Sequence, residues 1–266
     1  MHPIERLRMV ARAAGEGPAL LAQEAAGALV AFGDDPAGLV TACRRLVDRQ
    51  PTCGTIWWLA ARVLSASDAT AEAWAALEEL EVDTTPTVLA DGLPDGVVVT
   101  SVGLGEQVMA ALCRRGDIDV LVADVESTDP RTIRRLQRTG TVTHDVPVTG
   151  VAAAVEASGL VLIEADAAGP GGFVAPAGSR AAVAVARHAS VPVWAVAGVG
   201  RVLPGPLWDA LVARLAADEE PWLALEEVVP ADLVDHVVGP AGISDVGEAL
   251  RRPGCPVAPE LLKETE

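Results

Sequence analysis

Apolar residues recur at helical spacing through about the first 80 residues of the chain, and no β-rich run interrupts them. Most of the predicted helices are bounded by Pro or Gly, and Asp68 stands where it would cap the last one, with Glu72 in its first turn. The pattern therefore predicts an all-helical N-terminal region. Its predicted helices cover residues 1–15, 18–33, 35–50, 55–66 and 68–82.

The pattern changes near residue 86, where short, almost continuously apolar runs begin to alternate with helical segments. This alternation is typical of a parallel sheet covered by helices on both faces, as in doubly wound, Rossmann-like folds. We predict a helical domain over 1–84 and a Rossmann-like α/β domain with a C-terminal arm over 85–266, with Trp57 and Trp58 in the seam between them. The predicted strands are 96–101, 118–124, 141–146, 160–166 and 191–198; the predicted helices are 106–116, 129–140, 150–159, 179–190, 207–219 and 230–239.

Composition narrows the function classes. The formal net charge of −17 argues against direct binding of nucleic acid and of acidic membranes, because both carry negative charge. The N-terminus lacks the apolar stretch of a signal peptide, and no run is long enough to span a membrane, so we expect a cytoplasmic protein. The four cysteines form no CxxC pair, which predicts neither a metal site nor a disulfide framework.

Open parallel sheets bind ligands at the carboxyl ends of their strands, so the residues that follow each predicted strand are the candidates. Asp166 ends an apolar run and precedes a glycine-rich loop. A carboxylate there would act as a general base or bind sugar hydroxyls, although the loop is equally consistent with a plain turn. Ligand-binding candidates from backbone and hydroxyl groups are Ser101, Gly103, Gly105, Gly171, Gly172, Gly178 and Ser179.

Three other patterns bear on the chemistry of the chain. Gly103 and Gly105 precede a helix, and Asp124 ends the next strand, which is a partial dinucleotide fingerprint; Val108 stands where its third glycine would be. His144 and Asp145 are adjacent on a predicted strand, so they point to opposite faces and form no dyad. Cys53 lies at a predicted helix start, a position that lowers the pKa of a thiol.

Several segments together resemble the translation initiation factor 2B alpha/beta/delta family, which includes methylthioribose-1-phosphate and ribose-1,5-bisphosphate isomerases. The strongest likeness lies in 161–197, where an Ala-Asp and a Gly-rich loop precede a Gly-Ser and a helix. The other segments are similar to the family's Arg-Pro-Thr segment, its active-site loop and its closing segment. They are QPTCGTIWWLAARVL, VVVTSVGLGEQVMAAL and VVPADLVDHVVGPAG.

The resemblance implies an N-terminal helical domain, a Rossmann-like domain, a homodimer and a small phosphorylated metabolite as ligand, with no cofactor. It places the family's catalytic Asp on Asp166. The catalytic Cys falls on Val102, which cannot transfer a proton, and an Asn-Lys pair falls on Ala175 and Pro176. These departures favour a non-catalytic homologue that is either regulatory or binds a sugar phosphate or nucleotide. A sugar-phosphate isomerase using Asp166, with Ser101 or Cys53 as replacement acid, and a dinucleotide-binding protein are the alternatives.

Overall fold

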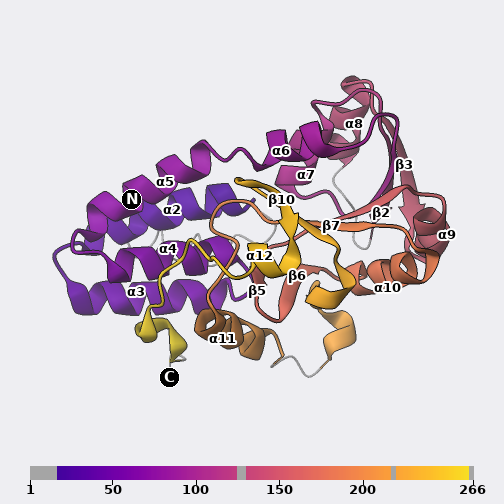
Figure 1. Cartoon of the computed structure of the whole chain (residues 1–266). Helices are drawn as coiled ribbons and strands as arrows, with labels where there is room; N and C mark the ends of the chain where they lie inside the picture. Colours follow the sequence, from indigo (N-terminus) through magenta and orange to yellow (C-terminus); the bar gives the residue numbers. More distant parts are fainter. Residues whose placement is uncertain (1–16, 125–129, 217–219, 264–266) are drawn as a thin grey trace.

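The computed structural model describes residues 17–124, 130–216 and 220–263, and Figure 1 shows their arrangement. The helix predicted over 1–15 lies outside these residues. The other N-terminal helices are confirmed, and the carboxylates of Asp35 and Asp68 accept backbone N–H bonds at two helix starts, both of 2.9 Å. The N-terminal helices are α2 (Pro18–Leu29), the 3₁₀ turn η1 (Val30–Phe32), α3 (Pro36–Arg49), α4 (Gly54–Ser65) and α5 (Ala69–Glu81).

A seven-stranded sheet forms the second part of the molecule, in the order β10-β9-β7-β4-β1-β2-β3. All neighbours are parallel except β10 and β9. This confirms the predicted doubly wound α/β class and the five strands that sequence patterning indicated. The strands are β1 (Val98–Val102), β2 (Asp119–Asp124), β3 (Val142–Pro147), β4 (Leu160–Glu164), β7 (Val193–Val196), β9 (His236–Gly239) and β10 (Gly242–Asp245).

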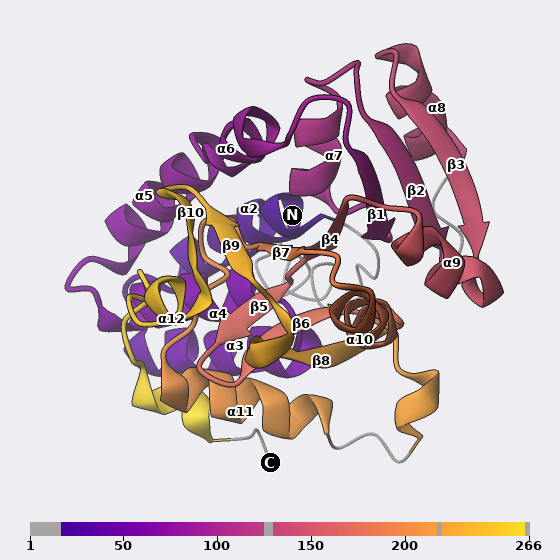
Figure 2. The ribbon, with the colours of Figure 1, turned by 45° about the vertical axis from the view of Figure 1, so that its right-hand side comes forward.

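Alternate residues of the buried strands pack against different helices, which explains their continuous apolar character. The side chains of Leu160 and Leu162 of β4 lie on one face of the sheet. This face is covered by α6 (Thr85–Gly92), α7 (Glu106–Leu112) and α8 (Pro130–Arg138). The side chains of Val161 and Ile163 lie on the opposite face. The helices on that face are α9 (Val151–Glu156), α10 (Ser179–Ala189) and α12 (Val246–Ala249), and Figure 2 shows both layers.

The prediction of a helix over 230–239 is wrong. This segment forms a 3₁₀ turn, η4 (Ala231–Leu233), and then β9, which pairs in parallel with β7. His236 therefore lies on a strand, where its ring meets Trp194 edge-on. The apolar run Val237-Val238 is too short for its period to distinguish a strand from a helix, and the decisive contact is made by β7, about 40 residues away in sequence.

A second sheet of three antiparallel strands was also not predicted: β5 (Ala167–Gly169), β6 (Gly172–Pro176) and β8 (Glu226–Pro230). Its first two strands, β5 and β6, follow β4 in the chain and pair as a hairpin, and the glycine-rich stretch after Asp166 forms this hairpin. The remaining elements are α11 (Gly205–Leu215) and the 3₁₀ turns η3 (Pro221–Leu223) and η5 (Pro259–Leu262). Among the described helices, none is both long and apolar enough to cross a membrane.

The helical part, the second sheet and α11 share one hydrophobic core. Trp57 and Trp58 of α4 are buried in it together with Ala167, Val174 and Trp208, which come from the second sheet and α11. The indole N–H of Trp58 donates to the carbonyl of Gly254 in the C-terminal arm, at 3.0 Å. The predicted role of the two tryptophans in the seam is confirmed, and the N-terminus of α4 is thereby brought to the carboxyl end of β4.

Candidate functional site

Asp166 lies between β4 and β5, and its backbone is held from two sides. Its N–H donates to the carbonyl of Val174 on β6 at 2.8 Å, and its carbonyl accepts the N–H of Gly54 at the start of α4 at 2.9 Å. The side chain is partly buried. The helical part and the second sheet therefore fix this carboxylate at the ligand-binding edge of the parallel sheet.

The charges around Asp166 are mostly negative. The pKa of Asp166 is raised to about 7: burial is the main cause, Arg201 lowers the pKa, and the carboxylates of Glu226 and Glu164 add to the rise. The pKa of Glu226 is itself raised by burial. A carboxyl group with a pKa near neutrality exchanges its proton readily at physiological pH, which suits it to acid–base chemistry or to hydrogen bonding in either protonation state.

Cys53 is brought to the same place. It is the residue before α4, it is buried, and it interacts electrostatically with Asp166 and Arg201. Burial raises the pKa of its thiol to about 12, so the lowered pKa expected at a helix start is wrong: the loss of hydration outweighs the partial positive charge of the helix end. The structure thus places a neutral thiol near the carboxyl group of Asp166.

Sequence reasoning missed Glu164, which forms a buried ion pair with Arg201 beside Asp166. Their Oε1 and Nη1 atoms are 2.8 Å apart, and the side chains are only 7% and 3% exposed. Arg201 also donates to the carbonyl of Ala165 at 2.8 Å, and Glu164 accepts the N–H groups of Gln107 and Val108 at 3.2 and 2.8 Å. The signal in the sequence was a glutamate at the end of an otherwise apolar strand, where an unpaired charge would be costly.

Ser101 is the second-last residue of β1, and Gly103 and Gly105 lie in the loop that follows this strand. The Ser101 hydroxyl donates to the carbonyl of Gly103 at 2.8 Å, and Gly103 has a φ of +66°, which favours glycine. A side chain at Gly105 would collide with the carboxyl group of Glu164. These residues therefore let Glu164 reach the start of α7; their part in ligand binding stays a prediction.

The backbone groups that a dinucleotide would need for its pyrophosphate are occupied in the structure. The N–H groups at the start of α7, which would hold a pyrophosphate, already bind the carboxylate of Glu164. Asp124 ends β2 next to β1, as that alternative requires, but position alone does not bind a ribose. The occupied helix start argues against a dinucleotide at this loop.

Gly178 and Ser179 begin α10, with Gly178 at a φ of +93°. The N–H groups of Gly178 and Arg180 donate to Oε1 of Glu227 on β8, at 2.6 and 3.0 Å. Within the described chain, the buried hydroxyl oxygen of Ser179 has no hydrogen-bond partner. Glu227, another residue that sequence reasoning missed, thus occupies the anion-binding groups of this helix start.

Gly171 and Gly172 form the turn of the β5–β6 hairpin, away from the Asp166 end of these strands. A side chain at Gly171 would meet the indole of Trp208, and one at Gly172, whose φ is +144°, would collide with the carbonyl of Val229. Packing alone accounts for both glycines. Their assignment to ligand binding stays a prediction that no contact near Asp166 supports.

No cluster of three or more His, Cys, Asp or Glu side chains in the described ranges is arranged to hold a metal ion. His144 and Asp145 are exposed on the edge strand β3 and take no part in the Asp166 site. The site is therefore made of Asp166, Glu164, Arg201, Cys53 and Glu226.

The chain matches no family model and no curated protein, but it is similar to solved structures over almost its whole length. Translation initiation factor eIF-2B from Pyrococcus horikoshii OT3 superposes with a TM-score of 0.77 at 15% identity, covering 93% of this chain and 98% of that one. The chain has the fold of translation initiation factor 2B subunits. The resemblance found in the sequence motifs is thereby confirmed at the level of the fold.

Two further neighbours have the same fold. The tetrameric eIF2B-beta2-delta2 complex from C. thermophilum matches with a TM-score of 0.76 at 18% identity, over 92% of this chain and 91% of that one. 5-Methylthioribose 1-phosphate isomerase from P. horikoshii OT3 matches with a TM-score of 0.64 at 14% identity, over 94% and 87%. Because initiation factor subunits and an isomerase share this fold, the activity must be argued from the site.

Proposed function

We propose that this protein is a non-catalytic, regulatory member of the initiation factor 2B fold, and that its Asp166 site binds the sugar part of a small metabolite. One observation carries the proposal. The groups that would hold a phosphate dianion are already bound to carboxylates of the protein itself: Arg201 to Glu164, and the start of α10 to Glu227. A dianion needs such charge-assisted donors, whereas a sugar hydroxyl donates to a carboxylate such as Asp166.

A ligand screen tests this proposal. Thermal unfolding is measured with ribose and adenosine, and with ribose 5-phosphate and 5-methylthioribose 1-phosphate. A ligand that binds only the folded state raises the melting temperature, and we expect the uncharged compounds to do so at least as well as the phosphorylated ones. Asp166→Asn should abolish the effect, and the exposed Asp145→Asn should not. Stabilisation by the phosphorylated compounds alone would contradict the proposal.

The second candidate is an aldose–ketose isomerase, favoured by the arrangement of Cys53 and Asp166. In that reaction Asp166 would take the proton from C2 of the sugar 1-phosphate and return it to C1. The neutral thiol of Cys53 would give a proton to the ring oxygen as the ring opens and take one back from the C2 hydroxyl, which becomes the ketone. The pKa of about 7 for Asp166 suits this role. The thiol pKa of about 12 does not, because so weak an acid gives up its proton slowly.

Turnover separates the two candidates. If 5-methylthioribose 1-phosphate or ribose 1,5-bisphosphate is isomerised, and Asp166→Asn abolishes the activity, the protein is an enzyme and the non-catalytic proposal is wrong. Cys53→Ala then reports on the thiol: a lower kcat with little change in KM would indicate that it acts in the chemical step. We expect no turnover with either substrate.

We also propose that the protein forms a homodimer. Support comes from one structural neighbour, which belongs to a tetrameric beta2-delta2 complex. Sedimentation equilibrium measures the state directly. A mass equal to one chain across the accessible concentration range would contradict the proposal.

A further inference from the structure

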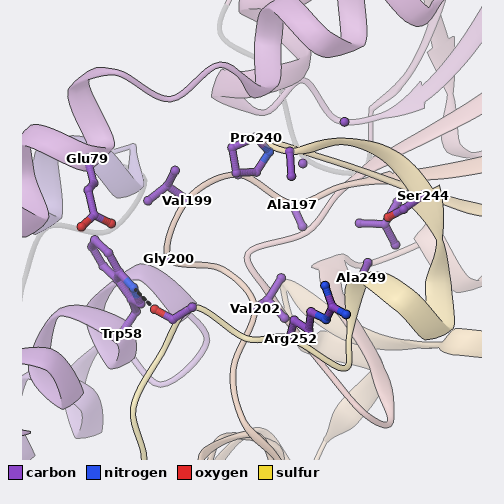
Figure 3. Close-up of a pocket in the computed structure, with 16 residues that line it drawn as sticks. Trp58, Glu79, Ala197, Val199, Gly200, Val202, Pro240, Ser244, Ala249 and Arg252 are labelled. Atoms are coloured by element: carbon purple, nitrogen blue, oxygen red, sulfur yellow. Dashed lines mark hydrogen bonds between the residues drawn. The ribbon is translucent and has the colours of Figure 1, made fainter.

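A separate cavity of about 280 Å³ lies beyond the carboxyl ends of β7 and β9, and Figure 3 shows it. Two loops form much of its wall, the one that follows β7 at Gly198 and the one that joins β9 to β10 at Gly239. Helix α4 contributes Trp58, and the residues after α12 contribute Arg252. The cavity therefore lies where the helical part, the sheet and the C-terminal arm meet, a common place for ligand sites.

The walls of this cavity are largely apolar. Glycines in both loops leave backbone instead of side chains along parts of the wall, which keeps the space open. The apolar lining residues are Trp58, Ala197, Val199, Val202, Val237, Pro240 and Ala249. A volume of this size is at the lower end of the range of about 300–1,000 Å³ for ligand pockets, so the occupant is a small molecule.

The cavity has two charged side chains, and only one is available to a ligand. The carboxylate of Glu79 is held by Arg62 of α4, at 2.7 Å. Arg252 is exposed, and its guanidinium has no hydrogen bond or ion pair with any residue that the structure describes. Figure 3 shows Arg252 beside Val202 and Ala249, away from Glu79. A free guanidinium next to apolar walls is a site for one anionic group, since it offers two parallel N–H donors.

This cavity is not part of the Asp166 site. The loop after β7 separates the two: Gly198, Val199 and Gly200 line the cavity, whereas the side chain of Arg201 turns to Glu164 and Ala165. The inference below is thus independent of the function proposed for Asp166.

We propose that this cavity binds a small monocarboxylate with an apolar body, its carboxylate on Arg252 and its body against Val202 and Val237. One guanidinium balances one negative charge. Among the described lining side chains, the Ser244 hydroxyl is the one other donor that is not already bonded, which is too few for a phosphate dianion. In a protein with a net charge of −17, an anion approaches against an unfavourable overall field, so a specific contact with Arg252 is needed to hold it.

The test uses the full chain and 4-fluorophenylacetate as probe, followed by ¹⁹F NMR titration. We expect saturable binding of the acid, and weaker binding of the uncharged 4-fluorophenylacetamide. Arg252→Gln should weaken binding of the acid by about tenfold, the effect of losing one charge-assisted hydrogen bond. Arg251→Gln is the matched control, because this neighbouring exposed arginine bonds to the carbonyl of Gly247 and does not line the cavity.

Further measurements distinguish this cavity from the Asp166 site, and a carboxylate ligand from phosphate. Binding of the acid should survive Asp166→Asn, so failure of the function proposed for Asp166 leaves this result unchanged. Equal binding of acid and amide, no effect of Arg252→Gln, or no saturable binding at all would overturn the proposal. Displacement of the probe by inorganic phosphate at concentrations where isovalerate has no effect would overturn the assignment to carboxylates.

Discussion

The buried ion pair between Glu164 and Arg201 offers a sharp test of how the site is built. Glu164→Gln removes the negative charge and keeps the shape of the side chain. Arg201, only 3% exposed, then loses its partner at 2.8 Å. Removing one member of a buried pair costs about 3–5 kcal/mol, because a charge is left in a poorly hydrated place.

That cost is large enough to measure by two methods. In urea denaturation, Glu164→Gln should lower the free energy of unfolding by about 3–5 kcal/mol at unchanged m-value. For a chain of this size the melting temperature should fall by about 6–20 °C. Arg201→Met should be similarly damaging. The double variant should lose about 1–3 kcal/mol less than the sum of the two, because each single change already removes the same pair.

The neighbouring Asp166 provides an independent measure that a general loss of packing would not move. Glu164 raises its pKa and Arg201 lowers it. Glu164→Gln should therefore lower the pKa of Asp166 and Arg201→Met should raise it, as followed by NMR of the Asp166 carboxyl carbon. The two variants destabilise alike but shift this pKa in opposite directions.

A surface pair serves as control. Arg187 and Asp235 are 3.5 Å apart with side chains 57% and 36% exposed, so Arg187→Gln should cost less than about 1 kcal/mol. If Glu164→Gln were equally mild, or if the double variant lost the full sum of the single losses, the reasoning from burial would be refuted.

Three further predictions concern the same region. Folding raises the pKa of Asp166 to about 7, so the folded state holds this proton more tightly; from about pH 4 to pH 7 the wild type should lose stability relative to Asp166→Asn in urea titrations. Cys53 is buried with a pKa of about 12, so Ellman's reagent should react first with the partly exposed Cys113, and Cys113→Ser should remove the fast phase. Glu227→Ala should destabilise by about 1–2 kcal/mol, because it uncaps α10.

Each of these has a contradicting result. Parallel stability curves for wild type and Asp166→Asn would show that Asp166 is ionised with an ordinary pKa. A fast phase that persists in Cys113→Ser and disappears in Cys53→Ser would show that Cys53 is accessible. For Glu227, the control is Glu248→Ala on the exposed start of α12; equal effects of the two changes would show that the bonds to α10 are not stabilising.

Much of the architecture could be predicted because it rests on local patterns. Helices such as α5 carry their own cap in Asp68, and central strands such as β4 are apolar on both faces, so each element is recognisable within a few residues. Asp166 was placed at the ligand-binding edge by the same logic. The second sheet and β9 were not predicted. Whether a short segment such as His236–Gly239 forms a strand depends on strands far away in the sequence, and local periodicity does not identify these partners.

The sequence by itself determined the helical N-terminal region, the parallel sheet, the edge on which Asp166 lies and the resemblance to initiation factor 2B. Only the tertiary structure decided which groups around Asp166 remain free. Arg201 and the start of α10 would each bind an anion in isolation, but in the fold they are already bonded to Glu164 of β4 and Glu227 of β8. Spacing in sequence does not reveal such pairings, because a charge is neutralised by whichever opposite group the fold brings within hydrogen-bonding distance.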